Sequence, residues 1–188
     1  MKTIFKFLSV GLFCVASSAN AALLQLSTSP VQSYGNQQDK SSNNTVSGNT
    51  IALNGNTWSS ISGMFNIIPE TTLTFDFMTS DLGEIHGIGF DNDSTIDPSA
   101  TFQLGGDQVW GIQDYVINLQ ENVTYSVTIN VGQYYTGMFN RIFFVNDEDR
   151  RRAVANSTFS NISVNNVSTP SVAVLMALAI AGFAFRRK

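Results

Sequence analysis

The sequence predicts an all-β fold, a jelly-roll-type β-sandwich flanked by an N-terminal signal peptide and a C-terminal apolar helix. Apolar and polar residues alternate along several stretches after Trp58, as in strands that bury one face. Turn-forming residues separate these stretches, and none of them has the helical period. Many short strands with turns at this spacing indicate a sandwich or a barrel.

Residues 1–21 have the three parts of a secretory signal peptide. A basic start precedes an apolar run over 7–16, and a small-residue cleavage pattern ends at Ala21. The run is shorter than the roughly 20 apolar residues that a spanning helix needs. We therefore expect export and cleavage after Ala21. The one cysteine, Cys14, leaves with this segment, so the exported domain contains no disulfide and depends on its core or on a metal.

Residues 166–188 form a second targeting segment. Thr169 and Pro170 suit the cap and the first position of a helix, an apolar run follows over 172–185, and Arg186-Arg187-Lys188 closes the sequence. A short apolar helix with a basic stop leaves the basic tip in the cytoplasm and the domain outside. This layout resembles the PEP-CTERM sorting signal of Gram-negative bacteria. The resemblance implies cleavage by a sorting protease, an exosortase, and transient residence in the inner membrane; the alternative is an ordinary C-terminal anchor.

Residues 22–165 remain as one domain, long enough to bury a core. All fourteen acidic residues lie here, with only five of the ten basic residues, which gives the domain a net charge of −9. This charge argues against nucleic acid or an anionic membrane surface as the partner. It fits an exported protein that binds cations or neutral glycans.

The strands are expected in a regular succession along this domain. Edge strands are predicted over 23–26 and 50–53, with an exposed loop over 37–44 between them. The alternation is clear over Leu73–Phe77, Ile85–Phe90 and Val123–Val131. Arg141–Val145 is predicted as an apolar strand, and Phe159, Ile162 and Val164 close the domain.

Two of these strands run into acidic turns. The candidate ligands are Asp91, Asp93 and Asp97 in the first turn, and Asn146, Asp147 and Asp149 in the second. Because clustered oxygen atoms suit a hard cation, we expect calcium at one or both turns. The first turn is not an EF-hand loop, since Ile96 stands where that loop has glycine. The alternative is that these acids only cap turns, a role for which Asp and Asn are favoured.

Aromatic residues are the candidates for contact with a polysaccharide, because their faces stack on the C–H faces of sugar rings. Those weighed are Trp58, Trp110, Tyr115, Tyr134 and Tyr135. Trp110 is favoured because the small and polar residues around it leave the indole exposed, whereas Trp58 is expected in the core. The predicted ligand-binding residues are Trp110, Tyr134, Tyr135, Asp107 and Gln108.

His86 is the only histidine, and on a strand it shares a face with Glu84. Such a pair can serve acid–base chemistry, but no nucleophile motif accompanies it, so a structural histidine is expected and no catalytic residue is assigned. The carboxylates of Asp76, Glu84 and Asp91 are the candidates for a glycosidase pair.

Four motifs occur in the order Glu84–Asp91, Gln108–Gly111, Val131–Gly137 and Phe144–Asp147. Together they resemble a β-sandwich module of secreted bacterial polysaccharidases that looks like a carbohydrate-binding domain. The resemblance implies a non-catalytic module that binds polysaccharide at the cell surface or outside the cell, here with no catalytic domain beside it. The alternatives are a structural protein of the extracellular matrix or biofilm, and a small polysaccharide hydrolase.

Overall fold

The computed structural model describes residues 22–38, 42–150 and 154–166. The predicted signal peptide and the predicted sorting segment beyond Asn166 lie outside the described residues. Within the described ranges, no helix is both long enough and apolar enough to cross a membrane.

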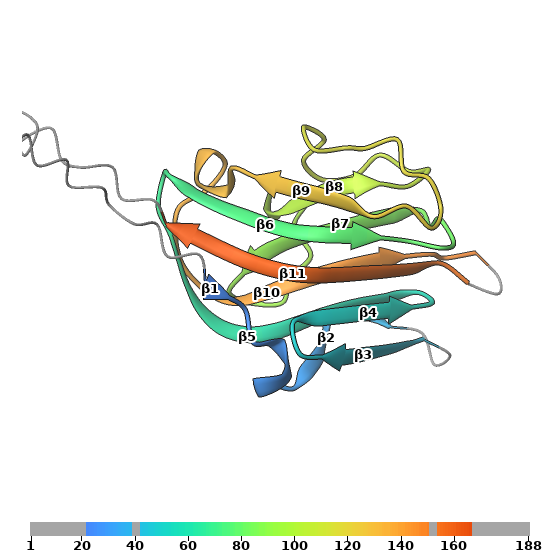
Figure 1. Cartoon of the computed structure of the whole chain (residues 1–188), viewed down its shortest axis with the longest axis horizontal. Coiled ribbons are helices and arrows are strands. Elements are labelled where there is room, and N and C mark those ends of the chain that lie inside the picture. Colours follow the sequence, from blue (N-terminus) through green and yellow to red (C-terminus); the bar gives the residue numbers. More distant parts are fainter. Residues whose placement is uncertain (1–21, 39–41, 151–153, 167–188) are drawn as a thin grey trace, which may run out of the picture. The chain divides into compact units, whose positions relative to one another are not determined.

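Two antiparallel sheets face each other, so the predicted all-β sandwich is confirmed (Figure 1). Sheet A has the order β3 (Asn43–Ser47), β4 (Thr50–Asn54), β11 (Asn156–Asn166), β6 (Thr71–Met78) and β9 (Tyr125–Ile129), and the short β1 (Ala22–Leu23) also pairs with β11. Sheet B has the order β2 (Val31–Gln38), β5 (Thr57–Ile67), β10 (Gly137–Asp147), β7 (Ile85–Asp91) and β8 (Thr101–Gly105). Single 3-10 turns, η1 (Leu26–Thr28), η2 (Pro98–Ala100) and η3 (Val131–Gln133), lie in the connections.

From β4 onward the chain passes back and forth between the sheets. β4, β6, β9 and β11 belong to sheet A, while β5, β7, β8 and β10 belong to sheet B. The orders 4-11-6-9 and 5-10-7-8 therefore face each other, as in a jelly roll. One consequence is that strands far apart in sequence, such as β5, β7 and β10, bring their ends together.

The main core lies between the sheets and follows the expected alternation. In β6, Leu73, Phe75 and Phe77 are buried and the residues between them are not. Phe159 of β11 packs against Phe77 and against Phe144 of β10, with ring centroids 5.1 and 5.2 Å away. Each such side chain contributes about 1.5–3 kcal/mol by its removal from water.

A second, smaller apolar layer covers the outer face of sheet B. It consists of Tyr34, Trp58, Ile85, Phe143 and Val145, with Ile96 and Trp110 packed over it from loops. This layer explains why β10 reads as a continuous apolar run. Its residues from Ile142 onward are buried on both faces of the strand.

Loops approach this outer face closely because β7 carries glycine there. A Cβ atom on Gly89 would collide with the carbonyl oxygen of Ala100 and with the Phe143 ring.

The N-terminal part differs from expectation. The predicted strand over 23–26 is reduced to β1 followed by η1, and β2 and β3 reach into the predicted loop over 37–44. β2 and β3 are edge strands. Most of their residues are exposed or only partly buried, so the apolar alternation that reveals a strand is weak.

Candidate functional site

Three carboxylates meet where β7 begins and β10 ends. Glu84 directly precedes β7, Asp147 closes β10, and Asp149 follows in the next loop. An oxygen atom from each lies within 4.8 Å of the other two. Among the described residues, these three form the one group in which three potential metal ligands converge in this way. We call Glu84, Asp147 and Asp149 the acidic cluster.

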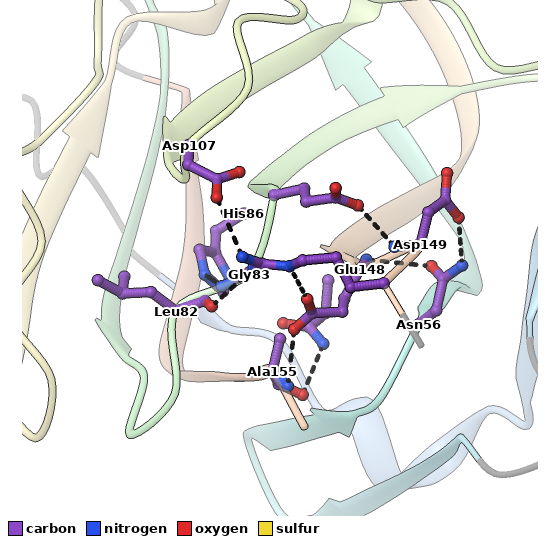
Figure 2. A network of polar contacts seen from close by, with 11 residues as sticks. Asn56, Leu82, Gly83, His86, Asp107, Glu148, Asp149 and Ala155 are labelled. Carbon is purple, nitrogen blue, oxygen red and sulfur yellow. Dashed lines mark hydrogen bonds and ion pairs between the residues drawn. The ribbon is translucent and has the colours of Figure 1, made fainter. Parts of the chain in front are cut away.

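Neighbouring polar groups fix the acidic cluster in place. The pairing of β5 with β10 sets Trp58 beside Val145, and the indole Nε1 donates to Asp147 Oδ1 at 2.7 Å. The backbone N–H of Asp149 donates to Glu84 Oε2 at 2.6 Å. Asn56 Nδ2 donates to Asp149 Oδ1 at 2.9 Å (Figure 2).

The electrostatics of the cluster favour a bound cation or proton. Burial raises the pKa of the Asp147 carboxyl, and the charges of Asp149, Glu84 and Glu148 act in the same direction, against the Trp58 hydrogen bond. A positive ion relieves this repulsion, and carboxylate oxygens are the ligands that calcium prefers.

Arg150 connects Glu148, which lies between Asp147 and Asp149 in the chain, with the loop that follows β8. Its guanidinium pairs with the buried Glu148 and, at 3.2 Å, with Asp107. Glu148 Oε2 also accepts the backbone N–H of Ala155 at 3.3 Å (Figure 2). A pocket of about 290 Å³ opens beside the Asp107 pair. It is lined by Leu82, Gly83, Gly106, Asp107, Ile117, Asn118, Leu119 and Arg150.

Trp110 stands on the same loop, but its indole has more apolar cover than expected. The ring is partly buried and meets Trp58 edge to face, with centroids 5.2 Å apart and planes at 80°. Its backbone N–H donates to Gln103 Oε1 at 2.9 Å. The prediction that Trp110 lacks apolar cover is therefore wrong, because Trp58, itself 3% exposed, supplies it. The assignment of Trp58 to the interior is confirmed.

Asp107 and Gln108 are exposed beside Trp110. The backbone N–H of Gln108 donates to the carbonyl oxygen of Glu84 at 3.0 Å, so this loop adjoins the acidic cluster. The fold thus gathers ligand-binding candidates and metal candidates that are far apart in sequence around one end of sheet B.

Tyr134 and Tyr135 lie elsewhere. They follow η3 rather than lying in a strand, and both rings contact Phe102, at 5.2 and 5.6 Å. The Tyr134 hydroxyl donates to Asp114 Oδ2 at 2.7 Å, and that ring is 36% exposed. The Tyr135 hydroxyl accepts the N–H of Phe90, and burial raises its pKa. Tyr134 alone of the two offers an open ring.

The acids of the first turn make local hydrogen bonds. Asp91 Oδ2 accepts the backbone N–H of Ser94 at 2.7 Å, Asp93 Oδ1 that of Thr95 at 2.7 Å, and Asp97 Oδ1 that of Ser99 at 2.8 Å. Within the described ranges, none of the three acids belongs to a group of three converging ligands. Their hydrogen bonds are those of turn caps.

Asn146 and His86 form a buried polar network on the core side of sheet B. Gly83 N–H donates to His86 Nε2 at 2.9 Å, so the proton of a neutral ring is on Nδ1, which faces the Ser157 hydroxyl at 2.7 Å. Asn146 accepts from Ser157 at 2.9 Å and donates to two backbone carbonyls. Burial lowers the pKa of His86 to about 4, and no bond joins the ring to Glu84 in the described network.

Glu84 was missed as a potential metal ligand, because sequence reasoning paired it with His86 along one strand. The available signal was that Glu84 opens a strand while Asp147 closes another. In an antiparallel pair these two ends meet, and here Ile85 faces Asp147.

No family model matches this sequence, and no curated protein matches it. Among solved structures, a carbohydrate binding module of family 29 aligns with a TM-score of 0.41 and 16% identity over 78% of this chain and 84% of that chain. A mutant of a family 29 module aligns with a TM-score of 0.43 and 15% identity, over 79% and 91%. The glycoside hydrolase domain of Endo-D from Streptococcus pneumoniae R6 aligns with a TM-score of 0.42 and 12% identity, over 74% of this chain and 22% of that chain. Such values do not place the chain in a family.

Proposed function

We propose that this protein is an exported, non-catalytic module that binds polysaccharide at the end of sheet B, with calcium held by Glu84, Asp147 and Asp149. The observation that supports this most directly is the convergence of Trp110 and the acidic cluster. Trp58 contacts both, because its ring packs against Trp110 and its Nε1 bonds to Asp147.

The roles follow from the chemistry of the side chains. The partly exposed indole of Trp110 supplies a flat apolar face for the C–H groups of a sugar ring, and Asp107 and Gln108 are exposed for bonds to its hydroxyls. Calcium takes about 6–8 oxygen ligands. Three carboxylates leave positions for water or sugar hydroxyls, which makes binding calcium-dependent.

Trp110→Ala tests the site. Truncation of an aromatic anchor commonly costs more than about 2 kcal/mol, or roughly thirtyfold in affinity. Separately, loss of the aromatic contact with Trp58 lowers the free energy of unfolding by about 0.5–1.5 kcal/mol. We expect a folded variant that is weakly retained in affinity gels containing polysaccharide. Val109→Ala is the matched control, because this neighbour is 85% exposed. Unchanged retention of Trp110→Ala would exclude this site.

Hydrolysis is the second candidate, supported by the raised pKa of Asp147 beside Glu84. Glycosidases use a pair of carboxyl groups, and an oxygen atom of Glu84 lies within 4.8 Å of one of Asp147. Release of reducing ends from a panel of polysaccharides, lost in Asp147→Asn, would favour this alternative. The proposed binding module releases none.

A further inference from the structure

The outer face of sheet A is almost free of charge. Along β3, β4, β6, β9 and β11, the side chains that alternate with core residues are Ser, Thr or Asn, with three exceptions: Ala52, Asp76 and Met78. None of the three exceptions is buried by another element. The domain has a net charge of −9, yet this five-stranded face carries a single acid and no base. The face is therefore much less charged than the rest of the domain.

The hydroxyl groups on this face are available to a ligand. Six threonines have side chains with no hydrogen-bond partner among the described residues: Thr45, Thr50, Thr72, Thr74, Thr128 and Thr158. Strand pairing sets Thr74 beside Thr128, and Thr158 beside Met78 and Ala52. Because neighbouring strands are about 4.8 Å apart, these groups form a regular grid.

Asp76 lies within the grid as a fixed acceptor. Ser126 Oγ donates to its Oδ1 at 2.6 Å, and Asn161 Nδ2 donates to its Oδ2 at 2.7 Å. Both donors come from the neighbouring strands of the same sheet. The carboxylate is thus held in one orientation, and each oxygen keeps a lone pair for a further donor.

We propose that the outer face of sheet A is a second contact surface for neutral polysaccharide, so that one molecule bridges two polysaccharide chains. A neutral chain rich in hydroxyls matches a neutral face rich in hydroxyls and amides. Charged partners find no opposite charge there beyond Asp76. Short, β-branched side chains lose little rotamer entropy on binding. A second copy of this chain is a poorer fit, because interface cores are apolar and aromatic, and this face is neither.

The bridging part rests on the function proposed for Trp110. That residue packs over the outer face of sheet B, through Trp58, so the two surfaces belong to opposite sheets of the sandwich. Two chains bound on opposite faces are joined by one protein, as a cross-linking component of a matrix requires.

The test uses the double variant Thr74→Lys/Thr158→Lys, which places long charged side chains on the face without touching the core. Thr136→Lys is the matched control, because Thr136 is exposed outside the sheet. Retention is measured on insoluble cellulose, mannan and chitin, together with thermal melting, sedimentation velocity and the turbidity of soluble mannan and glucan. We expect about tenfold weaker retention for the double variant, near-wild-type melting, and loss of turbidity. Trp110→Ala should also lose turbidity while it keeps part of its retention.

The outcomes separate the two proposals. Full retention and turbidity in the double variant, with loss in Trp110→Ala, would overturn the second surface and keep the first. Loss of retention in the double variant, with unchanged retention of Trp110→Ala, would overturn the Trp110 site. This face would then be the binding surface, without bridging. A wild-type dimer that the double variant dissociates would make this face an interface between copies and overturn the proposal. No retention of the wild-type protein on any of the neutral glycans would also overturn it.

Discussion

Asp147 is the residue in which structure and proposed function are most closely linked. It is buried, and it accepts a hydrogen bond from Trp58 while two other carboxylates lie within 4.8 Å. An ionised carboxylate in such a place is costly unless a proton or a bound cation neutralises its charge.

Asp147→Asn is therefore expected to have opposite effects with and without calcium. Without calcium, the amide removes like-charge repulsion and its oxygen still accepts from Trp58, so the melting temperature should rise. With calcium, the wild type should gain stability by mass action, about 2.7 kcal/mol at a hundredfold excess over Kd, and the variant should not. Differential scanning calorimetry in chelator and in calcium measures both. Glu121→Gln, an exposed acid elsewhere, is the control. Equal melting of the wild type in both buffers would remove calcium from the site.

His86 predicts a pH dependence of stability. Its pKa is about 4 in the folded protein and 6.5 in the unfolded chain, so the unfolded chain binds more protons between these values. The contribution of neutral His86 to the free energy of unfolding is fully present above pH 6.5. It is lost as pH falls toward 4, which lowers this free energy by about 3 kcal/mol. Urea unfolding at pH 7 and pH 5 should show a smaller difference for His86→Gln than for the wild type. The same difference in both proteins would mean that other groups cause the acid sensitivity.

Except for Glu84, the candidate residues could be named from sequence, but their grouping could not. Asp107, Gln108, Trp110, Asp147 and Asp149 were all identified, as members of two separate sites. Their convergence depends on the order of β5, β10 and β7 in sheet B, which no local pattern specifies. Tyr134 packs against Phe102, whereas Trp110 packs against Trp58 over the outer face of sheet B. The Asn146 side chain lies in the buried network, away from the Asp147 carboxylate, because successive residues of a strand face opposite sides.

At the scale of elements, β10 is the organising strand of sheet B. It lies between β5 and β7 and is buried on both faces over its C-terminal half. Its apolar run was evident in the sequence because a strand buried twice needs no polar alternation. β2 and β8 were not predicted, because neither has a clear apolar pattern. β2 has few buried residues, and β8 includes polar residues, such as Gln103, that are buried through hydrogen bonds to loops.

Gly89→Ala tests the close contact of the loops with sheet B. The added methyl group meets the Ala100 carbonyl and the Phe143 ring, and overpacking of this kind costs about 1–3 kcal/mol. Gly48→Asn is the control, because a Cβ atom there meets no atom within 4 Å and Asn tolerates its left-handed backbone. Guanidinium unfolding should show a large loss for Gly89→Ala and a small one for Gly48→Asn. Equal stability of the two variants would contradict the packing argument.

At the scale of the whole molecule, the proposed function requires that the sandwich reach the cell surface. The sandwich itself follows from alternation and turn spacing, and these signals are local. Export and sorting are inferred from residues 1–21 and 166–188, whose composition differs from that of the acidic domain between them. The apolar run over 172–185 and the basic residues after it are the part of this composition for which we predict a membrane anchor.

Deletion of 172–188 tests this last inference. If the apolar run and the basic tip hold the protein at the inner membrane until a protease acts, the deletion should release it from the membrane fraction of its host. The full-length protein should appear there in pulse-labelled cells and then pass to the surface or the medium. The matched control replaces Arg186, Arg187 and Lys188 with Gln and keeps the apolar run. Because basic residues set orientation, this variant should remain in membranes but be processed slowly. Fractionation that the deletion leaves unchanged would contradict a sorting role for the segment.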